Sequence, residues 1–274
     1  MSDLNKQMNI PQMMPLYGDL ERSLMSDYMA SGAFLTEHRK TLELEIALTE
    51  LLGIPHVHMA PSGTMALTMA GMVLGIGPGD EVIVPAYTMI ATANAFSMLG
   101  ATPVFVDVEP ETLCLDLSLV KDAVTSKTRA VILMSANGRS PSYPVDDLFE
   151  FCVSRGLYLI EDASQSLGSQ YPSGEFIGAK SHVACLSFSM PKIITMGQGG
   201  ALVTTSAELS EAIASLRNFG RASSGIDDHD CFGINGKITD MQAVIGIAQL
   251  QDLDRRVQRK KEIYQSYRDG LAGC

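Results

Sequence analysis

Two patterns of apolar residues alternate along the chain. Short apolar runs, which are typical of buried strands, are separated by longer segments in which apolar residues recur every three or four positions, as in helices with one packed face. This alternation predicts an α/β fold in which a parallel sheet is covered by helices. We expect strands at 57–60, 81–84, 102–106, 130–134, 158–161, 184–187 and 201–204. We expect helices at 42–52, 63–74, 91–99, 146–154 and 208–219.

The last stretch of the chain, 239–271, is expected to form one long amphipathic helix, because its apolar residues lie three, four or seven positions apart. These residues are Ile247, Leu250, Leu253, Val257, Tyr264, Tyr267 and Leu271. The same segment is locally basic through Arg255, Arg256, Arg259, Lys260 and Lys261. A solvated helix face explains these charges more simply than an anion-binding site.

The composition argues against several classes of protein. Of 274 residues, 20 are Lys or Arg and 31 are Asp or Glu, which gives a formal net charge of −11. This sign disfavours a nucleic-acid-binding protein, because a phosphate backbone attracts a basic surface. A hydrophobic share of 46% with only 19% charged residues disfavours disorder. The cysteines are odd in number and widely spaced, which favours reduced thiols, and none has the spacing of a metal site.

Neither a secretion signal nor a membrane span is predicted. The first residues, MSDLNKQMNIPQMM, contain Asp3 and Lys6 and are not followed by the apolar core of a signal peptide. The uncharged stretch 57–79 is interrupted by Pro61, Pro78 and several glycines, whereas a membrane span needs about 20 apolar residues without interruption. We therefore expect a cytoplasmic protein that does not contact a membrane.

An acid and an amine follow two of the expected strands. Asp162 comes directly after strand 158–161, and Lys192 lies shortly after strand 184–187, before glycines at 197, 199 and 200. Parallel sheets bind ligands at the carboxyl ends of their strands. A carboxylate buried there needs a cation or a hydrogen-bond donor, and a partly buried lysine is a nucleophile towards an aldehyde. The glycines allow the backbone to approach a ligand closely.

A phosphate site is predicted where strand 57–60 leads into Pro61-Ser62-Gly63-Thr64 and then a helix. The free N–H groups at the start of a helix, with hydroxyl groups beside them, suit a phosphate. A phosphate cradle, a lysine that can bind an aldehyde and an acid for a ring nitrogen together indicate a phosphorylated aldehyde cofactor. Pyridoxal phosphate carries all three groups.

Each of these residues also has a purely structural interpretation. Asp162 and the segment 62–64 are suitable helix caps, and a lone lysine such as Lys192 is usually a surface residue. Ser187 can satisfy a strand end, and Asn235 lies between two glycines, where a turn is common. Their occurrence together favours the functional interpretation.

Several segments resemble the DegT/DnrJ/EryC1/StrS family of fold-type I aminotransferases, which act on nucleotide-linked keto-sugars, and in particular its perosamine-synthetase-like members. The segments are 61–67, 82–85, 91–95, 102–107, 161–165, 187–200 and 235–246, and the similarity extends over 15–271. The resemblance implies the large pyridoxal-phosphate-binding domain of a fold-type I transferase, with a mostly parallel seven-stranded sheet between helices.

The resemblance also implies roles for residues around the cofactor ring. Lys192 would bind the aldehyde covalently and later move a proton between substrate and cofactor carbons. Asp162 would pair with the protonated pyridine nitrogen, and Gln165 would lie near the ring and its phenolic oxygen. Met89 occupies the position that usually stacks an aromatic side chain on the ring.

A second set of implied roles concerns the cofactor phosphate. Gly63, Thr64 and Ser187 would hold the phosphate of the same subunit. Asn235 would reach the phosphate of the neighbouring subunit, which implies a homodimer with shared active sites. No metal site is implied.

The implied reaction transfers an amino group, with glutamate as the expected donor, to a keto group of a nucleotide-linked deoxysugar used in cell-surface polysaccharides. A dehydratase of the same fold is an alternative. The family members associated with dehydration carry histidine at the position of Lys192, so this residue favours transamination.

The domain prediction follows from the length of the chain. Family members continue beyond the long helix into a smaller C-terminal domain, which we expect to be largely missing here. We expect an N-terminal arm and helix at 1–38, a pyridoxal-phosphate-binding α/β domain at 39–236, and at 237–274 a helix leading towards the shortened domain. A shortened, non-catalytic dimer or interaction protein is therefore a further alternative.

Overall fold

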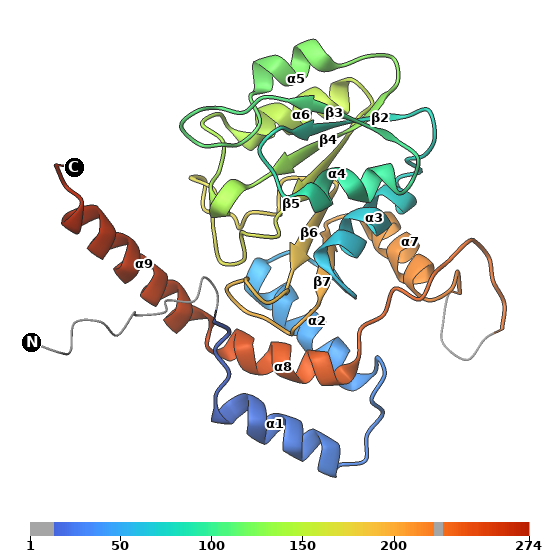
Figure 1. Ribbon diagram of the computed structural model, residues 1–274. Helices are drawn as coiled ribbons and strands as arrows, with labels where there is room; N and C mark the ends of the chain where they lie inside the picture. Colours follow the sequence, from blue (N-terminus) through green and yellow to red (C-terminus); the bar gives the residue numbers. More distant parts are fainter. Residues whose placement is uncertain (1–13, 222–226, 274) are drawn as a thin grey trace, which may run out of the picture.

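The computed structural model describes residues 14–221 and 227–273 of the chain (Figure 1). Within these residues, seven strands form one sheet in the order β1-β7-β6-β5-β4-β2-β3. The strands are β1 (His56–Ala60), β2 (Glu81–Pro85), β3 (Thr102–Val106), β4 (Thr128–Met134), β5 (Tyr158–Asp162), β6 (Val183–Ser187) and β7 (Gly200–Thr204). Strand β7 is antiparallel to both neighbours and the other pairs are parallel. All seven expected strands are present, and the mostly parallel sheet is confirmed.

The helices expected between the strands are also present. They are α2 (Arg39–Leu52), α3 (Gly63–Val73), α4 (Ile90–Ser97), α6 (Val145–Ser154) and α7 (Ala207–Arg217). Helix α1 (Asp19–Ala30) lies within the segment 1–38, where an arm and a helix are expected. Helix α5 (Leu117–Ala123) is not predicted by the sequence pattern, because its seven residues include one buried side chain and show no helical period.

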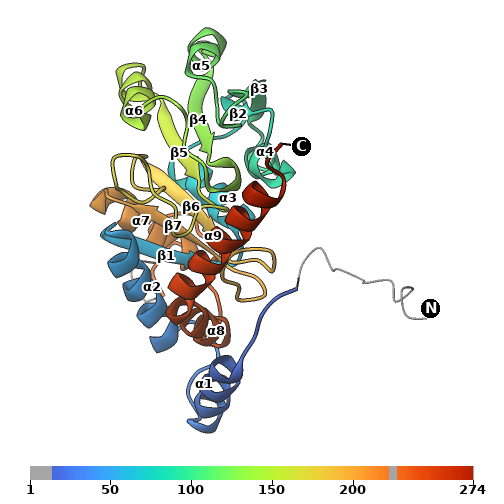
Figure 2. The same ribbon diagram turned by 90° about the vertical axis from the view of Figure 1, so that its left-hand side faces the viewer.

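Helices cover both faces of the sheet, since successive side chains in a strand point to opposite sides. In β4, Ala130 and Ile132 belong to a core layer shared with α3, α4 and α7. The alternate residues Val131 and Leu133 belong to the layer shared with α2 and α6. Figure 2 shows α6 and α4 on opposite sides of β4 and β5.

The sheet topology brings several strand ends to one edge. Strands β2, β4, β5 and β6 run in the same direction, so their carboxyl ends lie at the same edge. Strands β1 and β6 flank the antiparallel β7, and their register places Ala60 and Ser187 on either side of Gly200. The segments that follow β1, β5 and β6 therefore meet at the edge where such sheets bind ligands.

The prediction of one long C-terminal helix is wrong in one respect. The segment forms two helices, α8 (Asp240–Gln251) and α9 (Leu253–Gly270), which continue in different directions (Figure 1). At the break, Asp252 has φ −101° and ψ 5°, and its carboxylate accepts a hydrogen bond from Arg255 Nε at 2.6 Å. Aspartate is disfavoured inside helices because its carboxylate binds nearby donors instead. The break turns Leu253 into the core.

The two halves of this C-terminal segment differ in their environment. The apolar residues up to Val257 are buried or partly buried against the core, whereas Tyr264 and Tyr267 on α9 are 66% and 67% exposed. The expected solvated basic face is confirmed for Arg255 and Arg259, but Arg256 is an exception, because its side chain is only 14% exposed. It turns towards the body of the protein.

Three further predictions concern the membrane, the cysteines and the first residues. No helix in the described ranges has the length and apolarity that a membrane crossing requires. Four cysteines are free thiols, namely Cys114, Cys152, Cys185 and Cys231, and Cys274 lies outside the described residues. Residues 1–13, on which the absence of a signal peptide is predicted, also lie outside the described residues.

Candidate active site

Asp162 and Lys192 come together at the carboxyl edge of the sheet. Asp162 is the last residue of β5 and is 3% exposed. Lys192 is half-buried in the turn after β6, where its N–H donates to the carbonyl of Ser189 at 3.1 Å. Burial lowers the pKa of the Lys192 amine, and the nearby Asp162 carboxylate acts in the opposite direction. The structure thus brings the predicted acid and amine within electrostatic reach of each other.

The Asp162 carboxylate is held by two hydrogen bonds. Thr92 Oγ1, on the buried side of α4, donates to Asp162 Oδ2 at 2.6 Å, and the N–H of Ser164 donates to Asp162 Oδ1 at 3.1 Å. A carboxylate has about four lone-pair sites, so two remain for a further donor. A role for Thr92 is not predicted from the sequence, although Thr92 lies in the segment 91–95 that resembles the family.

The predicted phosphate cradle is assembled from three segments. Gly63, the first residue of α3, lies against Ser187 and Ser164: a Cβ at Gly63 would be 2.8 Å from the Ser187 Cβ and 3.2 Å from the Ser164 Oγ. A Cβ at Gly200 would collide with the carbonyl of Ser62. Glycine is therefore required at both positions, because the start of α3 packs against the last residue of β6 and the first residue of β7.

The start of α3 offers backbone donors to this cradle. The N–H of Met65 is capped by Ser62 Oγ at 3.1 Å. Within the described ranges, the N–H groups of Gly63 and Thr64 have no protein acceptor. Unpaired N–H groups at a helix start, beside the hydroxyl of Ser187, are the kind of donors that bind a phosphate, so the geometry is compatible with the predicted cradle.

Gln165 lies at the mouth of the same edge and is exposed. Its Oε1 accepts a hydrogen bond at 2.8 Å from the N–H of Asn137, in the loop that follows β4. In that loop the Ser135 N–H donates to the carbonyl of Asp162 at 3.3 Å. The fully buried Ser135 Oγ has no hydrogen-bond partner among the described residues.

The structure places Met89 and Asn235 differently from the other predicted residues. Met89 precedes α4, three residues before Thr92, and its side chain is 58% exposed. Asn235 is exposed and forms a bridge with Asn218 after α7. In the part of the chain that the structure describes, no hydrogen bond or ion pair links Asn235 to Lys192, Asp162 or the cradle.

A second carboxylate lies next to Asp162 but on the opposite side of β5. Glu161 is fully buried, and it accepts hydrogen bonds from the hydroxyl of Tyr171 and, at 3.4 Å, from the N–H of Lys180. Burial raises the pKa of Glu161 to about 7. Since side chains alternate along a strand, Glu161 packs into the layer of α2 and α6 while Asp162 meets Thr92 of α4.

Comparisons with known proteins show which family the chain resembles in sequence and fold. The sequence profile of the DegT/DnrJ/EryC1/StrS aminotransferase family matches residues 17–274. The chain is 34% identical over 264 residues to GDP-perosamine synthase of Vibrio cholerae. The aligned residues make up 96% of this chain and 71% of that protein. Its fold matches an aminotransferase from Streptoalloteichus hindustanus with a TM-score of 0.89 at 32% identity, over 96% of this chain and 72% of that one. A Streptococcus pneumoniae protein solved in a PLP form matches with a TM-score of 0.88 at 30% identity, over 97% and 72%.

Proposed function

The chain belongs to the DegT/DnrJ/EryC1/StrS aminotransferase family, and on that premise we propose that it transfers an amino group from glutamate to a keto group of a nucleotide-linked deoxysugar, with pyridoxal phosphate as cofactor. The observation that carries the proposal is the half-buried Lys192 beside the buried Asp162, at the same edge as the phosphate cradle. The similarity to GDP-perosamine synthase favours a sugar of a cell-surface polysaccharide.

The residues at this edge fit pyridoxal phosphate. The N–H groups of Gly63 and Thr64 and the hydroxyl of Ser187 would hold the phosphate. The free lone pairs of Asp162 would receive the protonated ring nitrogen, and the Lys192 amine would bind the aldehyde. When bound, this cofactor supplies an aldehyde that captures amino groups and a ring that withdraws electrons from the reacting bonds.

Lys192 Nζ is the group that moves the proton. Because burial lowers its pKa, the neutral amine is more accessible near neutral pH than in an exposed lysine. Nζ would remove the proton from the α-carbon of the amino donor and return a proton on the keto-sugar side in the second half-reaction. The same residue thus acts as base and acid in turn.

Asp162 is the electrostatic partner in this arrangement. Its negative charge at the end of β5 would keep a ring nitrogen protonated, because an opposite charge at close range favours the charged form of that nitrogen. Thr92 and Ser164 fix the carboxylate in one orientation, so that its free lone pairs face a constant direction.

The remaining predicted residues complete the proposal. Gln165 and Met89 would flank the ring, since both are exposed at the carboxyl edge of the sheet, where the ring would bind. Asn235 would reach the phosphate of a neighbouring subunit in a homodimer. Asn235 is exposed, and among the described residues no hydrogen bond joins it to the phosphate cradle of its own chain. Both observations support that role.

The two half-reactions provide a direct test. Glutamate added to the pyridoxal-phosphate-loaded chain should discharge the visible absorbance and yield 2-oxoglutarate, and a nucleotide-linked keto-sugar should restore the absorbance. GDP-linked keto-sugars are tested first, followed by UDP- and dTDP-linked ones, with Lys192→Ala as the inactive control. A spectrum that stays unchanged with every amino donor would overturn the proposal.

A further inference from the structure

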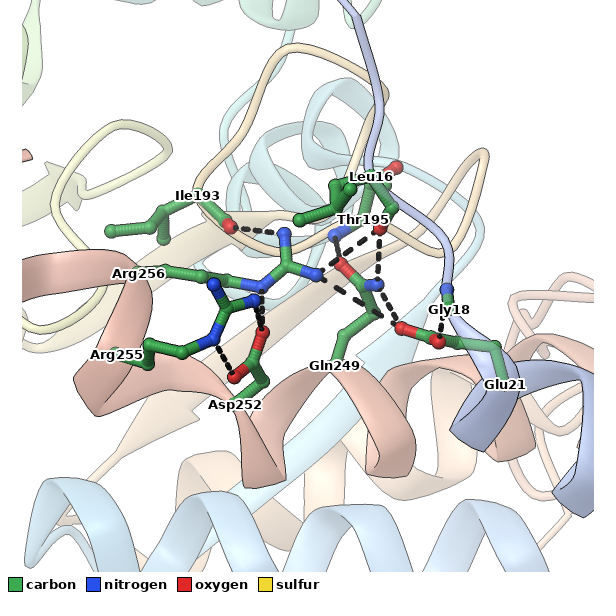
Figure 3. Close-up of polar contacts among 9 residues, drawn as sticks. All are labelled: Leu16, Gly18, Glu21, Ile193, Thr195, Gln249, Asp252, Arg255 and Arg256. Carbon is green, nitrogen blue, oxygen red and sulfur yellow. Dashed lines mark hydrogen bonds and ion pairs between the residues drawn. The ribbon is translucent and has the colours of Figure 1, made fainter. Parts of the chain in front are cut away.

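A buried polar cluster outside the site joins the N-terminal arm to the loop that follows Lys192. We call it the arm–loop joint and define it by Leu16 and Glu21 of the N-terminal arm, in which we include the start of α1, by Thr195 of the loop, Gln249 of α8 and Arg256 of α9 (Figure 3). These residues are up to 240 positions apart in the sequence. No sequence motif predicts that these residues come together.

Gln249 is the centre of the joint and is fully buried. Its Oε1 accepts a hydrogen bond from the N–H of Thr195 at 3.3 Å. Its Nε2 donates to the carbonyl of Leu16 at 3.0 Å and to the carboxylate of Glu21 (Figure 3). Both halves of the amide are therefore used, and neither an apolar nor a carboxylate side chain of similar size can make both sets of bonds.

Arg256 reaches the residue directly after Lys192. Its Nη1 donates to the carbonyl of Ile193 at 3.4 Å, and its Nη2 donates to the carbonyl of Leu16 at 3.1 Å. The same guanidinium lies 4.0 Å from Glu21 and 3.2 Å from Asp252. Arg256 thus fixes the backbone one residue from the amine and is itself held by two carboxylates.

The loop after Lys192 is also held by hydrogen bonds within itself and to Phe188, the residue after β6. Thr195 Oγ1 donates to the carbonyl of Phe188 at 3.2 Å and accepts from the N–H of Gly197 at 3.0 Å. The N–H of Met196 donates to the same carbonyl of Phe188 at 3.0 Å. These bonds tie the loop to the end of β6, and the arm–loop joint adds contacts to the same loop from α8 and α9.

Glu21 shows that the charges of the joint compensate one another. Burial works to raise the pKa of Glu21, but hydrogen bonds from Gly18 and Gln249 and the charge of Arg256 hold it below its ordinary value. The carboxylate is thus ionised near neutral pH, and removing either partner leaves buried polar groups unpaired. Directional bonds of this kind fix the place of a loop more narrowly than apolar packing does.

We propose that Gln249 and Arg256 are positioning residues for Lys192: by binding the backbone at Thr195 and Ile193, they hold the lysine loop so that its amine stays partly buried beside Asp162. This proposal rests on the proposed role of Lys192 in binding the cofactor. It adds that the N-terminal arm, through Leu16 and Glu21, is part of the support of the active-site lysine.

The test compares Gln249→Leu and Arg256→Ala with two matched controls, Gln251→Leu and Arg255→Ala. Gln251 is exposed on the same helix as Gln249, and Arg255 binds Asp252 without reaching the loop. Hydrogen exchange is measured on the full chain with and without pyridoxal phosphate. The peptide covering 193–197 should exchange about tenfold faster in the two joint variants, because each loses a hydrogen bond to the loop, and should be unchanged in the controls.

A second readout separates positioning from a purely structural effect. On the cofactor-free full chain, the rate at which trinitrobenzenesulfonate labels Lys192 is measured against pH by peptide mass mapping. The midpoint should shift upward, towards that of an exposed lysine, in both joint variants and in neither control. Arg256→Lys retains a cationic donor, so its labelling midpoint should shift less than that of Arg256→Ala. If Gln249→Leu fails to fold, Arg256→Ala and Arg256→Lys carry the test.

Folded joint variants with the loop exchange and labelling midpoint of the controls would overturn the proposal. Because both readouts also work without bound cofactor, this outcome is distinct from failure of the proposed function. That failure would show as an absence of cofactor on Lys192 in the unsubstituted chain.

Discussion

Two buried aspartates, one in the helical layer and one at the carboxyl edge of the sheet, are satisfied to different degrees. Asp240, at the start of α8, accepts four hydrogen bonds of 2.7–2.9 Å from the start of α2 and one of 3.0 Å from Tyr28 of α1. Asp162 accepts two, from Thr92 and Ser164. A carboxylate with every lone pair occupied can only join elements of the fold, whereas one with free lone pairs beside an amine can receive a ligand.

This difference predicts that a ligand stabilises the region around Asp162 and not the region around Asp240. The helical layer around Asp240 is complete without any other molecule. Among the described residues, the N–H groups of Gly63 and Thr64 at the carboxyl edge have no protein acceptor. Because a ligand that binds only the folded chain stabilises it, pyridoxal phosphate should raise the stability of the chain through the second region.

Asp162→Asn should have the largest effect on activity and little effect on stability. The amide retains an oxygen for the Ser164 N–H, and the Thr92 hydroxyl can accept a bond where it now donates. The charge that faces the ring nitrogen is lost, and we expect kcat to fall by about 10²- to 10³-fold. Steady-state kinetics and thermal unfolding of the same sample measure both effects, and a large loss of stability would contradict the comparison.

Asp240→Asn should show the reverse. Both carboxylate oxygens accept from donors of α2, so an amide group in either orientation points its N–H₂ at a donor, and we expect a loss of about 3 kcal/mol. Denaturant unfolding measures the loss, and the activity of the folded fraction should be unchanged. The two substitutions are matched controls for each other.

The same residue predicts a dependence on acid. Burial works to raise the pKa of Asp240, but the hydrogen bonds from Lys40, Thr41 and His38 hold it below its ordinary value of 3.8. A carboxylate with a lowered pKa stabilises the folded chain above pH 3.8, and this contribution is lost as the pH falls through the folded value. The stability difference between the unsubstituted chain and Asp240→Asn should therefore shrink in acid.

Glu161→Gln should change how stability depends on pH near neutrality. Burial raises the pKa of Glu161 from 4.5 to about 7, so between these values the folded chain holds a proton that the unfolded chain has released. Stability from this group falls as the pH rises through that range. We expect the decrease in Tm between pH 5 and pH 7 to be smaller in the variant.

A nearby carboxylate provides the control for Glu161→Gln. Hydrogen bonds from Ser173 and Lys180 lower the pKa of the exposed Glu175 to about 2, so its charge is constant between pH 5 and pH 7. Glu175→Gln should leave the slope of Tm against pH unchanged. An equal change in both variants would contradict the assignment of the slope to Glu161.

Met89→Ala should have the smallest effect. Met89 is exposed next to the start of α4 and makes one hydrogen bond through its sulfur, with the N–H of Ala91 at 3.3 Å. Contacts between a methionine sulfur and a ring are worth about 0.3–1.5 kcal/mol, so we expect the Kd for pyridoxal phosphate to rise by about two- to tenfold. Spectroscopic titration measures the Kd, and an unchanged value would remove Met89 from the proposed site.

The sequence predicts the sheet and most of its helices because their apolar periods are strong and local. It predicts Asp162, Lys192 and the cradle because each follows a strand, and strand ends converge in this fold. The resemblance to a family adds Gln165, Met89 and Asn235, which no local pattern distinguishes.

What the sequence misses depends on contacts between distant residues. Thr92 meets Asp162 across 70 positions, and Asp240 meets Thr41 across 199. Arg256 lies in a basic run in which its neighbours are solvated, and only the break at Asp252 turns it inward. No periodicity reports such contacts, because they depend on how the packed elements are arranged.

The central claim is that Lys192 binds pyridoxal phosphate opposite Asp162. Borohydride reduction of the full chain in the presence of pyridoxal phosphate, followed by peptide mass mapping, tests it most directly. We expect one cofactor adduct, on the peptide that contains Lys192, and a weaker adduct in Asp162→Asn. The absence of an adduct on that peptide, or an adduct on a different lysine, would show that Lys192 does not bind the cofactor.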